Sequence, residues 1–169
     1  MRDRAHVHLA LMNIRHTLGH LERRRIEGRV LVPFIEACRE KFGEQVTRDL
    51  VQAFIRRASI EDGARSAERF GGDMAGLRRI AEEVWGGEGG GIELQMLEET
   101  NDRLGFNVSR CRYAEMYKEW GLADLGFELQ CSRDHAMLEG FNDAIVLERS
   151  QTIMQGATCC DFRFHKKTA

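Results

Sequence analysis

The stretch Trp85-Gly86-Gly87-Glu88-Gly89-Gly90-Gly91 separates two halves of the chain that differ in their pattern of apolar residues. Before it, apolar residues recur at helical spacing, and after it they alternate as they do in strands. A phosphate-binding loop requires Lys-Ser or Lys-Thr where the next helix begins, whereas Ile92-Glu93-Leu94 follows here. We therefore expect a flexible connector at 86–91, which could also close over a ligand as a lid.

The order of helices followed by strands predicts an α+β fold, with N-terminal helices, then a small antiparallel sheet with short helices between its hairpins. We expect a single domain over residues 1–169, made of a helical half at 1–85, the connector, and a mixed half at 92–169. The elements expected in the mixed half are strands at 92–100 and 105–112, helices at 113–120 and 123–131, and strands at 144–155 and 158–165.

Four helices are expected in the first half. Apolar residues recur at helical spacing over 5–26, and a second stripe follows that ends at Gly43. Pro33 interrupts the second stripe, so we expect the second helix to begin near this proline. A third helix is expected over 44–70, and Asp73 is placed to cap a fourth.

Composition places the protein among globular chains. Of its 169 residues, 43% are hydrophobic and 31% are charged, and the formal net charge is -2. This charge creates no global field that would attract nucleic acid or an anionic membrane. No apolar run approaches the roughly 20 residues of a membrane span, and the N-terminus lacks the apolar centre of a signal peptide. We expect a cytoplasmic protein that binds a small-molecule substrate, and the sequence leaves a homo-oligomer open.

The chain has five cysteines, an odd number, and no CxxC pair. Without an export signal we expect reduced thiols, and neither a disulfide framework nor a zinc ribbon. In the last strand, alternation places Cys160 with Phe162 and Phe164 on one face and Cys159 on the other. Cys160 is then either a small buried hydrophobe or part of a pocket.

Cys111 ends a strand just before a helix and lies between Arg110 and Arg112. A thiol near a helix start and beside guanidinium groups has a lowered pKa and is more nucleophilic. Alternation along the strand places Cys111 on a face with Asn107 and Ser109, which suits the wall of a pocket. The alternative is that Cys111 only fills the inner face of its strand.

Cys131 and Asp134 are three residues apart, so they share one face if this segment is helical. A carboxylate at that place can orient water, accept a proton or hold a cationic substrate. The alternative is a helix end at which Arg133 and His135 are exposed to solvent.

Two further groups of charged residues are expected to face solvent. Glu148 and Arg149 lie on opposite faces of the strand expected at 144–155, where charges usually mark the solvated side of a sheet or, alternatively, the polar floor of a pocket. The run Arg23-Arg24-Arg25 is expected to form a solvated helix face, since no aromatic or glycine pattern typical of nucleic-acid binding accompanies it.

Five stretches of the mixed half together resemble those of a known family. They are Cys111-Arg112-Tyr113, Cys131-Ser132-Arg133-Asp134, Glu139-Gly140-Phe141-Asn142, Leu147-Glu148-Arg149-Ser150-Gln151-Thr152 and Gly156-Ala157-Thr158-Cys159-Cys160-Asp161-Phe162-Arg163-Phe164. With these stretches the chain resembles the L-2-amino-thiazoline-4-carboxylic acid hydrolase family. The resemblance implies hydrolysis of a small cyclic thiazoline to an N-carbamoyl cysteine, without a cofactor.

The implied reaction adds a nucleophile to the carbon of a cyclic C=N bond and expels a thiolate. From residue chemistry, the candidates for catalysis are Cys111, Cys131, Asp134 and Cys160, and those for substrate binding are Tyr113, Arg112, Glu148 and Arg149. Either Cys111 or Cys160 would be the nucleophile, and either Asp134 or Glu148 would carry the proton. The substrate carboxylate would pair with Arg112, Arg149 or Arg163. The hypothesis predicts that the four catalytic candidates share one cavity.

The alternative is a binding module without catalysis. The order of helices, hairpin and terminal strand pair is also similar to that of vinyl-4-reductase-type small-molecule-binding domains, some of which hold zinc. In that case Cys131 and Cys160 would be zinc ligands, while Thr152 stands where a third cysteine would fall.

Overall fold

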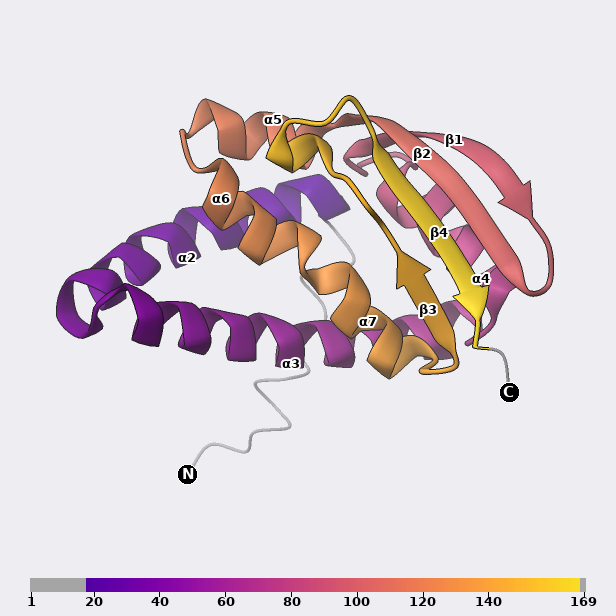
Figure 1. The fold of residues 1–169 in the computed structure, drawn as a ribbon, viewed down its shortest axis with the longest axis horizontal. Coiled ribbons are helices and arrows are strands. Elements are labelled where there is room, and N and C mark those ends of the chain that lie inside the picture. The colour runs from indigo at the N-terminus through magenta and orange to yellow at the C-terminus, as the bar shows by residue number, and fades with distance from the viewer. Residues whose placement is uncertain (1–17, 168–169) are drawn as a thin grey trace.

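The computed structural model describes residues 18–167. Its elements are α2 (His20–Phe42), α3 (Glu44–Phe70), α4 (Met74–Arg79), the π-helical segment η1 (Ile80–Trp85), β1 (Ile92–Glu99), β2 (Arg103–Cys111), α5 (Arg112–Glu119), α6 (Ala123–Gly126), the π-helical segment η2 (Phe127–Cys131), α7 (Arg133–Phe141), β3 (Ile145–Glu148), the 3₁₀ turn η3 (Ile153–Gln155) and β4 (Cys160–Lys166). Helices precede a four-stranded antiparallel sheet with short helices between its strands, so the predicted α+β fold is confirmed (Figure 1). The first expected helix lies mostly outside the described residues.

The sheet has the order β1-β2-β4-β3, so the last strand of the chain lies between β2 and β3. Phe106 of β2 is opposite Phe162 of β4, and their ring centroids are 4.9 Å apart. Cys160 and Phe164 are buried on the same face, whereas Asp161 is only partly buried. The predicted alternation of the last strand is confirmed. The sheet therefore has one apolar face that packs against helices.

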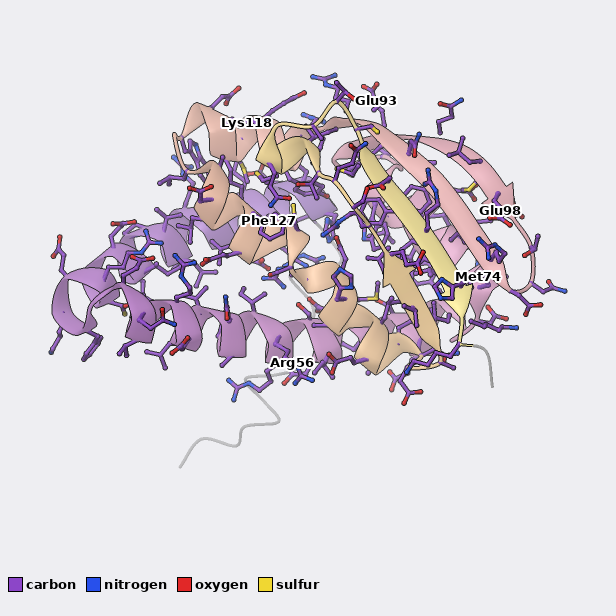
Figure 2. All side chains as sticks on the ribbon, in the orientation of Figure 1. Arg56, Met74, Glu93, Glu98, Lys118 and Phe127 are labelled. Carbon is purple, nitrogen blue, oxygen red and sulfur yellow. The ribbon has the colours of Figure 1, made fainter. Side chains whose placement is uncertain are left out.

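Two clusters of buried side chains hold the helices in place. The first joins the apolar face of the sheet to α4, η1 and α7, and includes Leu77 and Phe141. The second lies among α2, α3, α5 and α6, and includes Ile55 and Tyr117. Charged side chains such as Arg56 of α3 and Glu93 of β1 point into solvent (Figure 2). Among residues 18–167, no helix combines the length and the apolar character that crossing a bilayer requires.

The helical half agrees with the sequence pattern except at Pro33. Gly43 ends α2 with a φ of +82°, α3 has the predicted limits, and the side chain of Asp73 caps α4 by accepting a hydrogen bond from Gly76 N at 2.7 Å. However, α2 begins at His20 and continues through Pro33, so the predicted start was wrong. Packing on both sides of the proline keeps the helix intact, since Gly28 lies against α5 and Ile35 is buried.

The helix expected at 123–131 is observed as α6 and η2, but the sequence pattern did not predict α7, which follows them and ends at Phe141. One prediction for the mixed half was wrong. The strand expected at 144–155 ends at Glu148. The carboxylate of Asp161 accepts hydrogen bonds from the backbone N–H groups of Ser150 and Gln151 at 3.0 and 2.9 Å. After Glu148, these side-chain bonds replace the backbone hydrogen bonds that would continue the strand.

Helices α3 and α7 pack closely because each presents a glycine to the other. A Cβ atom added at Gly63 would overlap the backbone carbonyl of Met137, and one added at Gly140 would overlap that of Ile60. Ser59 of α3 is fully buried near this contact, and its hydroxyl donates a hydrogen bond to the Ile55 carbonyl at 2.7 Å. The backbones therefore approach to a distance that only glycine permits.

The sign of a stability change tests this packing. Gly140→Ala should lower the free energy of unfolding by about 1–3 kcal/mol, because the new methyl group overlaps α3. Helix propensity alone would change it in the opposite direction, by about 1 kcal/mol. Ala53→Gly at an exposed position of α3 is a suitable control, since it measures the contribution of helix propensity without any packing contact. Denaturant unfolding measures the free energy of unfolding of both variants. A Gly140→Ala variant that is more stable than the unaltered protein would contradict the close packing of α3 on α7.

Candidate functional site

A cavity of about 500 Å³ lies between the helices and the apolar face of the sheet. Its wall combines α2, α3 and η1 from the helical half with β2, α5, η2, α7 and β4 from the mixed half. Much of the wall is apolar, including Phe70, Ile80, Trp85, Val108, Met137 and Phe162. Three cysteines, an aspartate and several arginines complete it. The two halves of the chain thus contribute to one cavity.

Cys111 reaches this cavity because of a bulge in β2. The register shifts between Glu93 and Leu94 of β1, which leaves Ser109 as an extra residue in β2. The extra residue reverses the alternation, so that Cys111 joins Val108 on the cavity wall. The prediction that Cys111 shares a face with the polar residues before it was therefore wrong.

Two of the cavity thiols accept hydrogen bonds from backbone N–H groups. Cys111 is the N-cap of α5, and its Sγ accepts a hydrogen bond from Ala114 N at 3.4 Å. Cys160 begins β4, and its Sγ accepts one from Ile153 N at 3.2 Å. Both side chains are thereby fixed in direction at the ends of regular elements.

The third thiol belongs to a cluster with a partly buried ion pair. Cys131 ends the π-helical segment η2, and Asp134 lies in the first turn of α7. Arg149 pairs with the Asp134 carboxylate and also donates a hydrogen bond to the Cys131 carbonyl at 2.9 Å. Its guanidinium carbon lies 5.0 Å from the ring centroid of Phe162, a cation–π contact. Arg149 therefore joins α7 to the sheet, and only 5% of its side chain is exposed.

Burial raises the pKa values of the acidic groups in the cavity. Desolvation raises the pKa of Cys111 to about 11, which outweighs the hydrogen bond from Ala114, and the nearby Cys160 raises it further. Desolvation is also the largest cause of the raised pKa values of Cys131 and Cys160. The pKa of Asp134 is raised by desolvation against the opposing effect of Arg149. The predicted lowering of the Cys111 pKa was wrong because burial outweighs the helix start.

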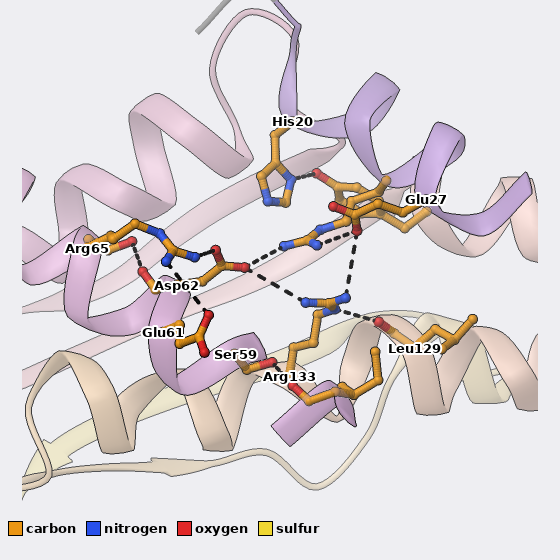
Figure 3. A network of polar contacts seen from close by, with 12 residues as sticks. His20, Glu27, Ser59, Glu61, Asp62, Arg65, Leu129 and Arg133 are labelled. Carbon is orange, nitrogen blue, oxygen red and sulfur yellow. Dashed lines mark hydrogen bonds and ion pairs between the residues drawn. The ribbon is translucent and has the colours of Figure 1, made fainter. Parts of the chain in front are cut away.

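A network of buried charges forms another part of the wall, and the sequence pattern did not predict it (Figure 3). Arg24 is 6% exposed, and it contacts Glu27 at 2.6 Å and Asp62 at 3.5 Å. Arg133 is 8% exposed, and its Nε donates a hydrogen bond to the Leu129 carbonyl at 2.7 Å. The expectation that 23–25 forms a solvated helix face was wrong for Arg24. Its acidic partner Asp62 lies 38 residues away in the sequence, so no local pattern could reveal the pair.

His20 and Tyr113 lie between this network and the thiols. The Nδ1 atom of His20 is 2.6 Å from the Tyr113 hydroxyl. Burial lowers the pKa of His20 well below its usual range, and Arg24 lowers it further. The ring is therefore neutral and pairs with the tyrosine hydroxyl as a hydrogen-bond partner.

The structure brings six of the eight predicted site residues together on the cavity wall, namely Cys111, Cys131, Cys160, Asp134, Tyr113 and Arg149. The expected convergence of the four catalytic candidates is thus observed, while their roles remain predictions. Arg112 and Glu148 lie outside the cavity. Arg112 lines a separate polar hollow beside the connector, and the side chain of Glu148 is 72% exposed.

The alternative zinc site has no set of ligands within residues 18–167. In that range no group of three or more His, Cys, Asp and Glu side chains is arranged to hold a metal ion. Thr152, which stands at the position of a third cysteine, directs its hydroxyl to Gln155 as the cap of η3. The residues present therefore do not fit the zinc site that this alternative requires.

Comparison with known proteins gives one family, and the similar solved structures include two of low sequence identity. The model of a family described as L-2-amino-thiazoline-4-carboxylic acid hydrolase matches residues 23–164. No protein with curated function matches the chain.

The first structure is the phenol-responsive sensory domain of the transcription activator PoxR with phenol, with 13% identity, a TM-score of 0.48, and coverage of 81% of this chain and 73% of that one. The second is a trafficking protein particle complex subunit 3 from Naegleria fowleri covalently bound to palmitic acid, with 9% identity, a TM-score of 0.49, and coverage of 88% and 98%. At these TM-scores neither likeness bears on function.

The raised pKa of Cys111 predicts how this thiol reacts with iodoacetamide. Only the thiolate is alkylated, so the rate at Cys111 should still rise tenfold per pH unit between about pH 7.5 and 9.5. A free thiol such as N-acetylcysteine should begin to level off in this range. Mass spectrometry of the labelled peptides measures the rate at each cysteine, and circular dichroism checks that the protein stays folded. A plateau at Cys111 near pH 9 would show that its pKa is not raised.

Proposed function

Because the chain belongs to the L-2-amino-thiazoline-4-carboxylic acid hydrolase family, we propose that it opens a small cyclic C=N substrate, such as L-2-amino-thiazoline-4-carboxylate, to N-carbamoyl-L-cysteine. One observation carries the proposal: Cys111, Cys131, Cys160 and Asp134 line a single cavity. A thiol nucleophile and a carboxylate that can move its proton are what the reaction requires.

Cys160 is the nucleophile that we favour. Its pKa is raised by burial, but the Ile153 N–H and the positive charge of Arg149 both act to lower it. Arg149 lowers and Asp134 raises the pKa of Cys131 too, but burial and then the Asp134 charge are the largest causes there, and the pKa is raised more strongly. Among the cavity thiols, Cys160 therefore combines a fixed direction with cationic stabilisation of its thiolate.

The proposed reaction has two steps. In the first, Cys160 Sγ attacks the ring carbon between nitrogen and sulfur, Asp134 accepts the thiol proton, and the ring C–S bond breaks. The ring sulfur takes the proton from Asp134, which leaves an isothiourea bonded to Cys160. In the second, water adds to the same carbon, the bond to Cys160 breaks, and the thiol is restored. The sum is one water consumed and one ureido acid with a free thiol released.

Asp134 suits the proton transfer because its pKa is raised towards that of the thiol. Arg149 holds this carboxylate, since it pairs with Asp134 and with the Cys131 carbonyl at the same time. Of the three arginines predicted for the substrate carboxylate, only Arg149 lines the cavity. With its guanidinium committed to these partners, we assign it to positioning Asp134.

Turnover of L-2-amino-thiazoline-4-carboxylate, followed by release of the product thiol, tests the proposal. Cys160→Ser should lower kcat by about 100-fold or more, because a hydroxyl is a much weaker nucleophile than a thiol at neutral pH. Cys159→Ser is the matched control, since Cys159 is adjacent but accepts a hydrogen bond from Gln151 outside the cavity. Full turnover by Cys160→Ser would exclude this thiol as nucleophile, and no turnover by the unaltered protein would leave a binding module as the function.

The pH dependence of kcat tests the role of Asp134. Only the deprotonated carboxylate accepts a proton. Because its pKa is raised, activity should begin to fall, as the pH is lowered, while the pH is still above about 4 and an exposed aspartate would still be ionised. Asp134→Asn should remove this acidic limb together with most of the activity. A profile that stays level down to about pH 4 would speak against Asp134 as the base.

A further inference from the structure

The cavity is larger than a thiazoline acid requires. Its volume of about 500 Å³ falls within the roughly 300–1,000 Å³ of pockets that enclose drug-sized ligands. A single five-membered ring with one carboxylate would leave much of this space unfilled. Water would have to fill the remainder, although a large part of the wall offers it no hydrogen-bond partner.

One end of the cavity is apolar. Phe70, Ile80 and Phe162 belong to the core cluster beneath the sheet, and Val84 and Trp85 pack against it. Cys160 is a member of the same cluster, and Cys111 packs against it as well. The thiols therefore lie at the border of an apolar compartment that can hold a hydrocarbon or aromatic group.

The other end carries buried positive charge that its acidic neighbours compensate only in part. Arg133 approaches Glu27 at 3.7 Å and Asp62 at 3.9 Å, and both distances exceed hydrogen-bond length. Burial and the charge of Arg24 lower the pKa of Arg133 to about 10. The Nε atom of Arg24 is buried and has no hydrogen-bond partner among the described residues. A bound carboxylate would supply the missing acceptors.

Tyr113 connects the two ends. Its hydroxyl contacts His20 at 2.6 Å, and the pKa of the tyrosine responds first to burial and then to Arg24 and Cys111. Tyr113 is thus close enough to the arginines and to the thiols to feel the charge of each. The wall therefore runs from the arginines past Tyr113 to the thiols, and from there to Phe162.

We propose that the ligand of this cavity is a carboxylic acid with an apolar substituent, whose carboxylate binds Arg24 and Arg133 and whose apolar group packs against Trp85 and Phe162. The placement of the reacting C=N bond at Cys160 rests on the proposed hydrolase function. The chemistry of the two ends rests on the wall alone. The substrate class is then cyclic C=N acids that are larger and more apolar than the simple thiazoline.

Plain carboxylates test the two ends without any reaction. Titration calorimetry with acetate, butyrate, hexanoate, octanoate and 3-phenylpropanoate should show that affinity rises about fourfold for each buried methylene. The last acid shows whether an aromatic group is preferred to an unbranched chain. Hexanamide should bind at least about tenfold more weakly than hexanoate, because it carries no charge for the arginines. Equal affinities along the series, or equal binding of acid and amide, would overturn the proposal.

Two matched variants locate the apolar group. Val84→Phe fills the apolar end and should weaken octanoate binding while leaving butyrate unchanged. Val46→Phe makes the same change on an exposed surface of α3, where Val46 is 51% exposed and outside the cavity, and should alter neither. If Val84→Phe weakened the binding of butyrate and octanoate equally and left Tm unchanged, the apolar group would have to bind elsewhere.

Arg133→Gln locates the carboxylate, since it should remove the preference for hexanoate over hexanamide. If this variant does not fold, the comparison of hexanoate with hexanamide on the unaltered protein still tests whether the cavity binds a carboxylate. Turnover of the thiazoline without binding of any plain acid would refute this inference and leave the hydrolase proposal intact. Binding of the acids without turnover would refute the hydrolase and leave the ligand chemistry in place.

Discussion

The close contact of α3 with α7 is the constraint on which the cavity depends. Gly63 and Gly140 let the two backbones approach without intervening side chains, so these helices behave as one rigid unit. Asp62 lies one residue before the first glycine, and Asp134 lies six residues before the second. One acidic partner of each arginine group, Asp62 for Arg24 and Asp134 for Arg149, is therefore carried by the same unit. Its position against the sheet determines how far the charged end lies from the thiols.

Burial of ionisable groups shapes the chemistry of the cavity. Burial raises the pKa values of the three thiols and so favours their protonated form at neutral pH. The arginines stay charged because the partly exposed carboxylates of Glu27 and Asp62 lie beside them, yet both carboxylates lie beyond hydrogen-bond distance of the Arg133 guanidinium. A buried charge with incomplete pairing is costly to the folded state. A bound anion would reduce that cost, so ligand binding and stability are coupled.

The sequence predicts a feature well when the residues that determine it are close together along the chain, and poorly when they are far apart. The limits of α3, the cap at Asp73 and the inward face of Cys160 follow from neighbouring residues, and the structure agrees with them. Arg24 was misplaced because its partner belongs to another helix. Helix α7 was missed because Gly140 weakens the local helical signal while serving the contact with α3. Likewise, the Cys111 pKa depends on burial by segments remote in the sequence.

The bulge at Ser109 decides which side chain of β2 reaches the cavity wall. A regular ladder over the same sequence would place Arg110 on the inner face and turn Cys111 to the outer face. If Ser109 were lost, the ladder would become regular and Arg110 and Cys111 would keep the strand partners that they have now. The inward position of Cys111 therefore depends on where the extra residue is accommodated, and related chains with and without this residue could present the same thiol to the cavity.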